Sequence, residues 1–186
     1  MILLSIASAA AGPSLDGTTA RPLLGHAFVE LRGGVQGGGA TGVGGTLCGQ
    51  ISPLRYVAIE ACGSGGGFLF PDASSELVHF RAEAHIPLMS QGALDLALEP
   101  GVGFAELEAG ADAPGFRFGP ARSPDQREGA GPAASLALKG RWWARPRWFV
   151  TMETGVSVAS IPSAPVVAGT SGPVITSGMT TVGLGF

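Results

Sequence analysis

The chain ends with the segment TSGMTTVGLGF, residues 176–186. One side of an extended strand over this segment carries Val182, Leu184 and Phe186, while the other side carries Thr181 and small glycines, because successive side chains of a strand point to opposite faces. The alternation predicts a β-strand with one apolar face, and this strand is the starting point for interpreting the rest of the chain.

The same period of two recurs along the sequence, where helical periodicity is weak. In the clearest stretch, Val78 and Phe80 alternate with His79 and Arg81. Each stretch has roughly the ten residues that a tilted transmembrane β-strand needs. We count about eight: residues 26–35, 40–51, 55–63, 76–87, 94–107, 133–144, 147–159 and 175–186.

Short and long connections between these stretches alternate. The short ones fall near residues 52–53, 88–92 and 145–146, the long ones at 63–75, 108–132 and 161–174, and a Gly-rich link near 36–39 is intermediate. This asymmetry is typical of barrels with short turns at one end and long loops at the other. The longest loop is polar and contains several prolines, so we expect it to be mobile.

The terminal aromatic strand, the eight alternating stretches and the loop asymmetry together resemble the small eight-stranded bacterial outer-membrane β-barrels of the OmpA/OmpX-like group. The resemblance covers about residues 22–186. It implies an all-β, closed antiparallel up-and-down transmembrane barrel in the bacterial outer membrane, with both termini on the periplasmic side. It also implies that the barrel-assembly machinery recognises Val182, Leu184 and Phe186 as an assembly signal.

The amino-terminal residues 1–21 are expected to lie outside the barrel domain, which we assign to residues 22–186. Met1–Ala11 is apolar and contains the small residues Ala7-Ser8-Ala9, as in a secretory signal peptide, although the first basic residue is only Arg21. The two long uncharged stretches of the chain are interrupted by Pro or by many Gly, so neither predicts a membrane-spanning helix.

Composition and motifs argue against several functions. The net charge is −3 and there is no block of basic residues, so we expect no nucleic-acid binding. There is no G-x-S-x-G segment and no phosphate-binding loop, and the spacing of the two cysteines does not fit a zinc site. His26, His79 and His85 form no Ser–His motif on the lipid-facing side. We therefore expect no enzymatic activity, no cofactor and no metal.

Ionisable residues are concentrated on the face opposite to the apolar one. The interior of an eight-stranded barrel is just filled by side chains, and an unpaired buried charge costs several kcal/mol, so these residues must pair. We expect a structural network that plugs the lumen, with a narrow ion path as the alternative. Its members are Glu30, Arg32, Glu60, Arg81, Glu83, Asp95, Glu99, Lys139, Arg141 and Glu153.

Guessed hairpin registers predict individual pairs. A turn centred on residue 90 pairs Arg81 with Glu99 and His85 with Asp95; a turn at Pro146 pairs Lys139 with Glu153 and Trp143 with Phe149; the long hairpin brings Glu99 close to Lys139 or Arg141. A slip by two residues would keep every side chain on its face, so the faces are better determined than the pairs.

Cys48 and Cys62 have the same inward parity on neighbouring strands. If their hairpin is centred near Arg55 they face each other and a disulfide is possible, whereas a tighter turn at residues 52–54 offsets them. Export to an oxidising compartment favours the bond.

Members of the resembled group stabilise the envelope, adhere to surfaces or contact hosts, and some are small channels. Trp142 and Trp148 have lipid-facing parity near a short turn, as at a membrane interface. We therefore expect an integral outer-membrane protein in contact with membrane lipid, with a structural, adhesive or surface-interaction role carried by its outer loops and an extracellular partner bound there. The alternatives are a small channel or porin, a lipid-modifying barrel enzyme, and a soluble lipocalin-like ligand-binding barrel.

Overall fold

The structure, a computed structural model, describes residues 28–54, 56–64, 75–110, 116–145 and 148–186. It contains nine β-strands and one short helix in this part of the chain. In chain order they are β1 (Phe28–Gly38), β2 (Gly42–Leu54), β3 (Val57–Ser64), β4 (Ser75–Ala84), β5 (Ile86–Gln91), β6 (Leu94–Ala109), β7 (Glu128–Arg145), β8 (Trp148–Ser160), α1 (Ala164–Val167) and β9 (Val174–Gly185).

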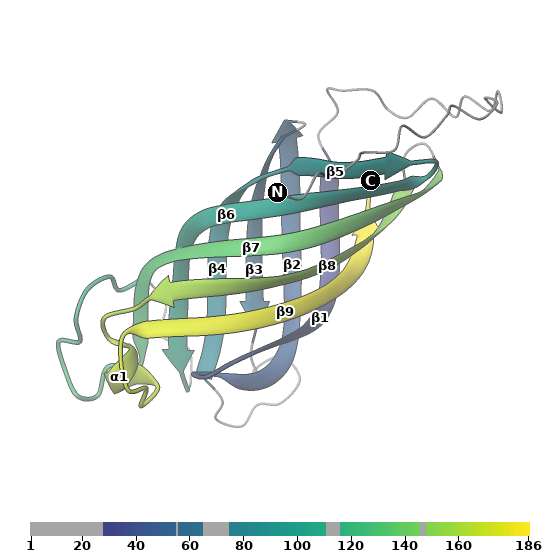
Figure 1. The fold of residues 1–186 in the computed structure, drawn as a ribbon. Helices are drawn as coiled ribbons and strands as arrows, with labels where there is room; N and C mark the ends of the chain where they lie inside the picture. The colour runs from purple at the N-terminus through teal and green to yellow at the C-terminus, as the bar shows by residue number, and fades with distance from the viewer. Residues whose placement is uncertain (1–27, 55, 65–74, 111–115, 146–147) are drawn as a thin grey trace, which may run out of the picture.

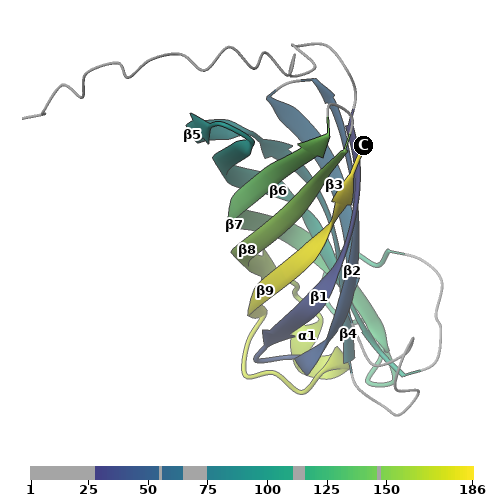
Figure 2. The same ribbon diagram turned by 90° about the vertical axis from the view of Figure 1, so that its right-hand side faces the viewer.

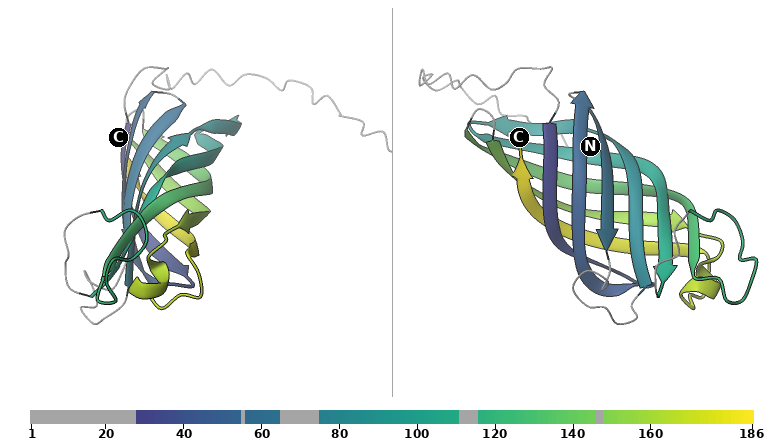
Figure 3. Two further views of the ribbon diagram at one scale, coloured as in Figure 1. Left: turned by 90° about the vertical axis from the view of Figure 1, so that its left-hand side faces the viewer. Right: turned by 180° about the vertical axis from the view of Figure 1, so that it is seen from behind.

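Eight of the strands close into one antiparallel barrel (Figures 1 and 3). Neighbours in sequence are neighbours in the sheet, β1 pairs with β9, and β4 pairs directly with β6. Closure leaves the barrel strands without a free edge, as a transmembrane sheet requires. The predicted eight-stranded up-and-down barrel is thus confirmed.

β5 is the additional strand. It continues the path of β4 after His85, pairs with β6, and has all six residues exposed. Figure 2 shows it standing away from β3 at one end of the barrel. The sequence predicted one strand through residue 87, but the strand is interrupted at His85, and β5 continues to Gln91. Within β5 the register with β6 shifts between Pro87, which lacks an amide proton, and Met89.

The two ends of the barrel differ. The turn end carries the short links β2–β3, β5–β6 and β7–β8 together with the C-terminus, and Gly92 provides the positive φ of 57° that the β5–β6 turn uses. The loop end carries the turn at residues 39–41, the described part of the β6–β7 connection, residues 116–127, and the connection 161–173 with α1, and β3 ends and β4 begins there. The predicted loop 108–132 is shorter than expected, because β7 begins at Glu128.

The wall is apolar outside and charged inside. Leu31, Val102 and Val156 are about 60–70% exposed on the outer face, while Glu30 and Arg32 are 1% exposed on the inner face. This is the reverse of the arrangement that a soluble barrel with an apolar interior requires, and it is the arrangement of a barrel surrounded by lipid.

Within the described residues, no helix combines the length and the apolar character that crossing a bilayer would require. The amino-terminal segment 1–21 and His26 lie outside the residues that the structure describes.

Candidate functional site in the barrel lumen

The structure places all ten ionisable residues of the predicted network on the inner face of the barrel. Eight are at most 6% exposed, while Asp95 and Arg141 near the turn end are partly buried. Burial this complete makes pairing obligatory, since an isolated charge could not stay ionised there.

Two arginines from opposite parts of the network share the same two glutamates. Arg32 on β1 forms ion pairs with Glu60 and Glu153. Arg81 on β4 reaches the same pair, with Nε donating to Glu60 Oε1 at 2.8 Å and a terminal nitrogen to Glu153 Oε1 at 2.9 Å. Arg81 Nε also lies 2.8 Å from Glu83. The network therefore crosses the lumen from β3 to β8.

Lys139 and Arg141 on β7 complete the network. The Lys139 ammonium lies 2.6 Å from Glu99 and 2.9 Å from Glu153, and it donates to the side chain of Gln50. Arg141 Nε donates to Glu30 Oε1 at 2.8 Å. Each cation thus has a carboxylate partner, and strands on all sides of the barrel are tied together.

The oxygens of Glu60, Glu83 and Glu153 lie close enough together to hold a metal ion. The guanidinium groups of Arg32 and Arg81 already lie among them. The positive charge that a hard cation would supply is therefore provided by the protein, and the site fits a structural ion-pair cluster better than a metal centre.

The register of the β4–β6 pair differs from the one predicted. Arg81 lies opposite Gly103, not Glu99, and His85 Nδ1 lies 2.8 Å from Glu99, not from Asp95. The turn is at Gly92-Ala93, which moves β6 by four residues along β4. An even shift keeps every side chain on its face, so the inward set survives although the pairs change. Across β7 and β8, Lys139 does lie opposite Glu153 and Trp143 opposite Phe149.

Aromatic rings cover the network at the turn end. Trp143 and Phe149 lie 4.7 Å apart by ring centroids, and Phe28 makes edge contacts with both at 5.6 and 5.8 Å. Trp143 Nε1 donates to Asp95 at 2.7 Å, which satisfies the indole. A Cβ at position 185 would overlap the Phe149 ring, so glycine there makes room for it. We call Phe28, Trp143 and Phe149 the aromatic lid.

An apolar cluster fills the lumen at the loop end. The connection after β8 carries α1 at the loop end of the barrel (Figure 1). Ile161 and Ala164 are fully buried and pack in one cluster with the inward side chains of the wall. We call this cluster the apolar plug. Its buried members are Leu77, Ala105, Leu107, Ala159, Ile161, Ala164, Val167 and Ile175.

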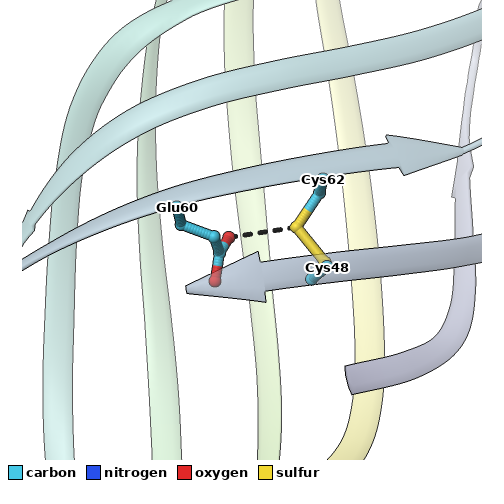
Figure 4. Close-up of side chains that lie close together, drawn as sticks. All are labelled: Cys48, Glu60 and Cys62. Atoms are coloured by element: carbon cyan, nitrogen blue, oxygen red, sulfur yellow. Dashed lines mark hydrogen bonds between the residues drawn. A yellow bond between two sulfur atoms is a disulfide. The ribbon is translucent and has the colours of Figure 1, made fainter. Parts of the chain in front are cut away.

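A disulfide joins Cys48 on β2 to Cys62 on β3, two residues that lie directly opposite each other (Figure 4). The pairing of Cys48 with Cys62 centres the hairpin on position 55. Of the two turns considered from the sequence, this is the wider one, which places the cysteines opposite each other. Met179 of β9 packs against the sulfur pair. The disulfide therefore occupies the lumen between the ion-pair network and the apolar plug.

The outer wall carries aromatic residues at both ends. Trp142 and Trp148 are about half exposed near the turn end, and Trp148 lies 6.2 Å from Phe186 by ring centroids. Near the loop end, Phe116 and Phe118 of the segment after β6 contact outward rings of the wall. Phe116 lies 5.4 Å from Phe80 and 5.1 Å from Phe104. Part of the longest loop thus lies along the outer face.

Sequence reasoning missed the aromatic lid, the apolar plug and the outer Phe cluster. A signal for the plug was present in the loop after β8, where Ile161, Ala164 and Val167 are spaced by three. That spacing marks one face of a helical turn, which a search for period two does not detect.

Comparisons with known proteins support the fold. No family model and no curated protein sequence matches the chain. Among solved structures, Neisserial surface protein A is similar with a TM-score of 0.55 at 12% identity over 86% of this chain and 95% of that one. The N-terminal β-barrel domain of Pseudomonas aeruginosa OprF gives 0.45 at 12% identity, over 84% of this chain and 96% of that one. The chain has the fold of a small eight-stranded outer-membrane barrel.

Proposed function

We propose that this protein is a non-conducting integral barrel of the bacterial outer membrane whose loop end faces the exterior and makes its surface contacts. The turn end, with the C-terminus, faces the periplasm in this orientation. The role is structural or adhesive, and any extracellular partner binds at the loop end.

The filling of the lumen is the observation that carries the proposal. Along the axis, the aromatic lid, the ion-pair network, the disulfide and the apolar plug follow one another. A channel needs a continuous polar path whose groups exchange partners with the passing ion. Here Lys139 and Glu153 are fully buried and bound to each other, so an ion would have to displace an internal partner.

Planar-bilayer recording of the purified, refolded protein tests the closed lumen. We expect no discrete conductance steps at protein levels where a wide porin, added as a positive control, produces them. Reproducible unitary steps would refute the non-conducting barrel and favour the small channel.

Cysteine labelling on whole cells tests location and orientation. The native cysteines are joined in a disulfide, so a single new thiol gives a clean signal. A membrane-impermeant maleimide is expected to label Arg122→Cys in the loop after β6 on intact cells. The matched variant Leu88→Cys in β5 at the turn end should react only after the outer membrane is opened. Labelling of Leu88→Cys but not Arg122→Cys on intact cells would show that the barrel has the opposite orientation.

We further propose that the strand β9 is the segment that the barrel-assembly machinery binds, through Val182, Leu184 and Phe186. All three side chains point outward and are about half exposed. In the membrane they contact lipid, so before insertion they are free to be recognised.

A further inference from the structure

We propose that the lumen contains a redox-gated site for a soft metal cation, formed by Cys48, Cys62 and His79 when the disulfide is reduced. The oxidised form has no thiolate to offer and leaves the site closed.

The three residues form one row across three neighbouring strands. Cys48 on β2 lies opposite Cys62 on β3, and Cys62 lies opposite His79 on β4. Residues paired in this way have Cβ atoms about 4.5–5.5 Å apart. All three face the lumen and are at most 4% exposed. The three side chains therefore start from adjacent positions on rigid strands, away from water. In the oxidised structure the ligand atoms that lie within 4.8 Å of one another are the two sulfurs and a Glu60 carboxylate oxygen, so the imidazole must turn toward the sulfurs to complete the site.

His79 points to a ligand independently of the cysteines. Among the described residues, neither of its ring nitrogens has a hydrogen-bond partner, although both are buried. Leaving a buried polar group unsatisfied costs about 1–3 kcal/mol, so such groups are rare and need an explanation. A neutral imidazole with a free nitrogen, on the strand next to the two cysteines, is a suitable metal ligand.

The surroundings fit a soft cation. Met179 packs in one cluster with the two cysteines, so a side chain with a polarisable thioether lies next to the site. Glu60 Oε1 lies 3.1 Å from Cys62 Sγ (Figure 4). A disulfide sulfur has no proton to donate, so in the oxidised form this is only a close contact. In the reduced form the Cys62 thiol can donate to Glu60 across the same gap.

The chemistry balances with a dithiol as reductant. The dithiol transfers two electrons and two protons to the Cys48–Cys62 bond, which yields two thiols while the donor becomes a disulfide. A divalent cation then displaces both thiol protons and binds the two thiolates. The product is electrically neutral, so it adds no charge to the lumen. Thiolate and imidazole ligands select soft or borderline cations such as Cd2+ and Zn2+ over Mg2+.

Cadmium binding by the full-length protein tests the site. The protein is refolded in detergent from the denatured state, once oxidised and once with a phosphine reductant, at a series of Cd2+ concentrations, so that the cation is present before the lumen closes. Binding is measured in each refolded sample by thiolate-to-cadmium charge-transfer absorption. We expect one Cd2+ per reduced barrel, none in the oxidised barrel, and no competition by excess Mg2+. A reduced, folded barrel without this absorption would overturn the proposal.

Variants separate the histidine from a non-specific thiol effect. His79→Gln should weaken Cd2+ binding by about tenfold or more, the loss typical of disrupted metal sites, while Ser157→Ala, a lumen change on β8, should leave it unaltered. The heat-dependent gel shift verifies folding of each variant. If His79→Gln does not fold, X-ray absorption on the reduced native protein decides instead. Sulfur ligands together with the outer-shell scattering of an imidazole ring support the site, and sulfur or oxygen ligands without the imidazole pattern refute it.

Discussion

Lys139 on β7 and Glu153 on β8 lie directly opposite each other, with the ammonium 2.9 Å from the carboxylate and both residues at most 1% exposed. Removing one partner leaves an uncompensated charge in the lumen. We expect Lys139→Met to lower the free energy of unfolding by about 3–5 kcal/mol. Denaturant titration in detergent, followed by the heat-dependent gel shift, measures the change.

The matched control, Arg122→Gln, removes a positive charge from the surface. It should change the free energy of unfolding by less than about 1 kcal/mol. Adding Glu153→Gln to Lys139→Met should recover part of the loss, because it lowers the excess of negative charge that Lys139→Met leaves in the lumen, while Arg32 and Arg81 keep Glu60 as a carboxylate partner. Equal effects of Lys139→Met and Arg122→Gln would contradict the buried network.

Gly185 lies where a side chain would overlap the Phe149 ring of the aromatic lid. Gly185→Ala should therefore destabilise the barrel by about 1–3 kcal/mol, the usual range for overpacking. The control Gly178→Ala on the same strand places its Cβ 3.8 Å from the nearest atom and should be nearly neutral. Trimming the ring with Phe149→Leu should rescue Gly185→Ala, and a lack of rescue would show that the ring is not the cause.

Phe186 is bound through its backbone, which exchanges two 3.0 Å hydrogen bonds with Val29, while its ring is 59% exposed. Phe186→Ser keeps the backbone pairing, so we expect refolding in detergent to be unchanged. If the assembly machinery reads this ring, the amount of barrel in the outer membrane of expressing cells falls several-fold. Val174→Ser, an equally exposed change at the other end of β9, is the control. Equal membrane levels for both variants would remove the assembly role.

Phe116 ties the segment after β6 to the outer wall through Phe80 and Phe104. Phe116→Ala removes two edge-to-face contacts, each worth about 0.5–1.5 kcal/mol beyond the buried area. We expect trypsin to cleave faster after Arg122 in the variant barrel, which mass spectrometry of the fragments measures. The control Val43→Ala, in an exposed position near another turn, should leave the rate of cleavage after Arg122 unchanged. An unchanged cleavage rate in Phe116→Ala would show that the ring contacts do not hold the segment.

The wall of the barrel could be predicted because alternation is a local property. His79 and Arg81 face inward in any register that preserves parity, so burial and face followed from the sequence without knowledge of the partner strand. The cross-strand ion pairs were harder to predict than the faces, because they depend on turn geometry. The pair Lys139–Glu153 was predicted correctly, since Pro146 marks its turn in the sequence. The predicted partner of Arg81 was wrong, because the turn at Gly92 lies farther along the chain than expected and the register shifts between Pro87 and Met89.

The closures at the two ends could not be predicted, since they depend on contacts between distant segments. The aromatic lid needs Phe28 to meet Phe149, and the apolar plug needs α1 to enter the barrel beside Leu77. Neither contact produces a periodic pattern in the sequence. The unpartnered nitrogens of His79 likewise emerge only when the neighbours on β3 and β6 are known.

The packing of α1 makes the loops unequal as sites for inserted sequence. Ile161 and Ala164 are part of the interior, so a foreign peptide placed beside them would displace the apolar plug and open the loop end of the lumen. Gly119 adopts a left-handed φ of 102° and has open space around it. Diversification of this protein, by evolution or in a surface-display library, should therefore concentrate around residue 119 and leave residues 161–167 fixed.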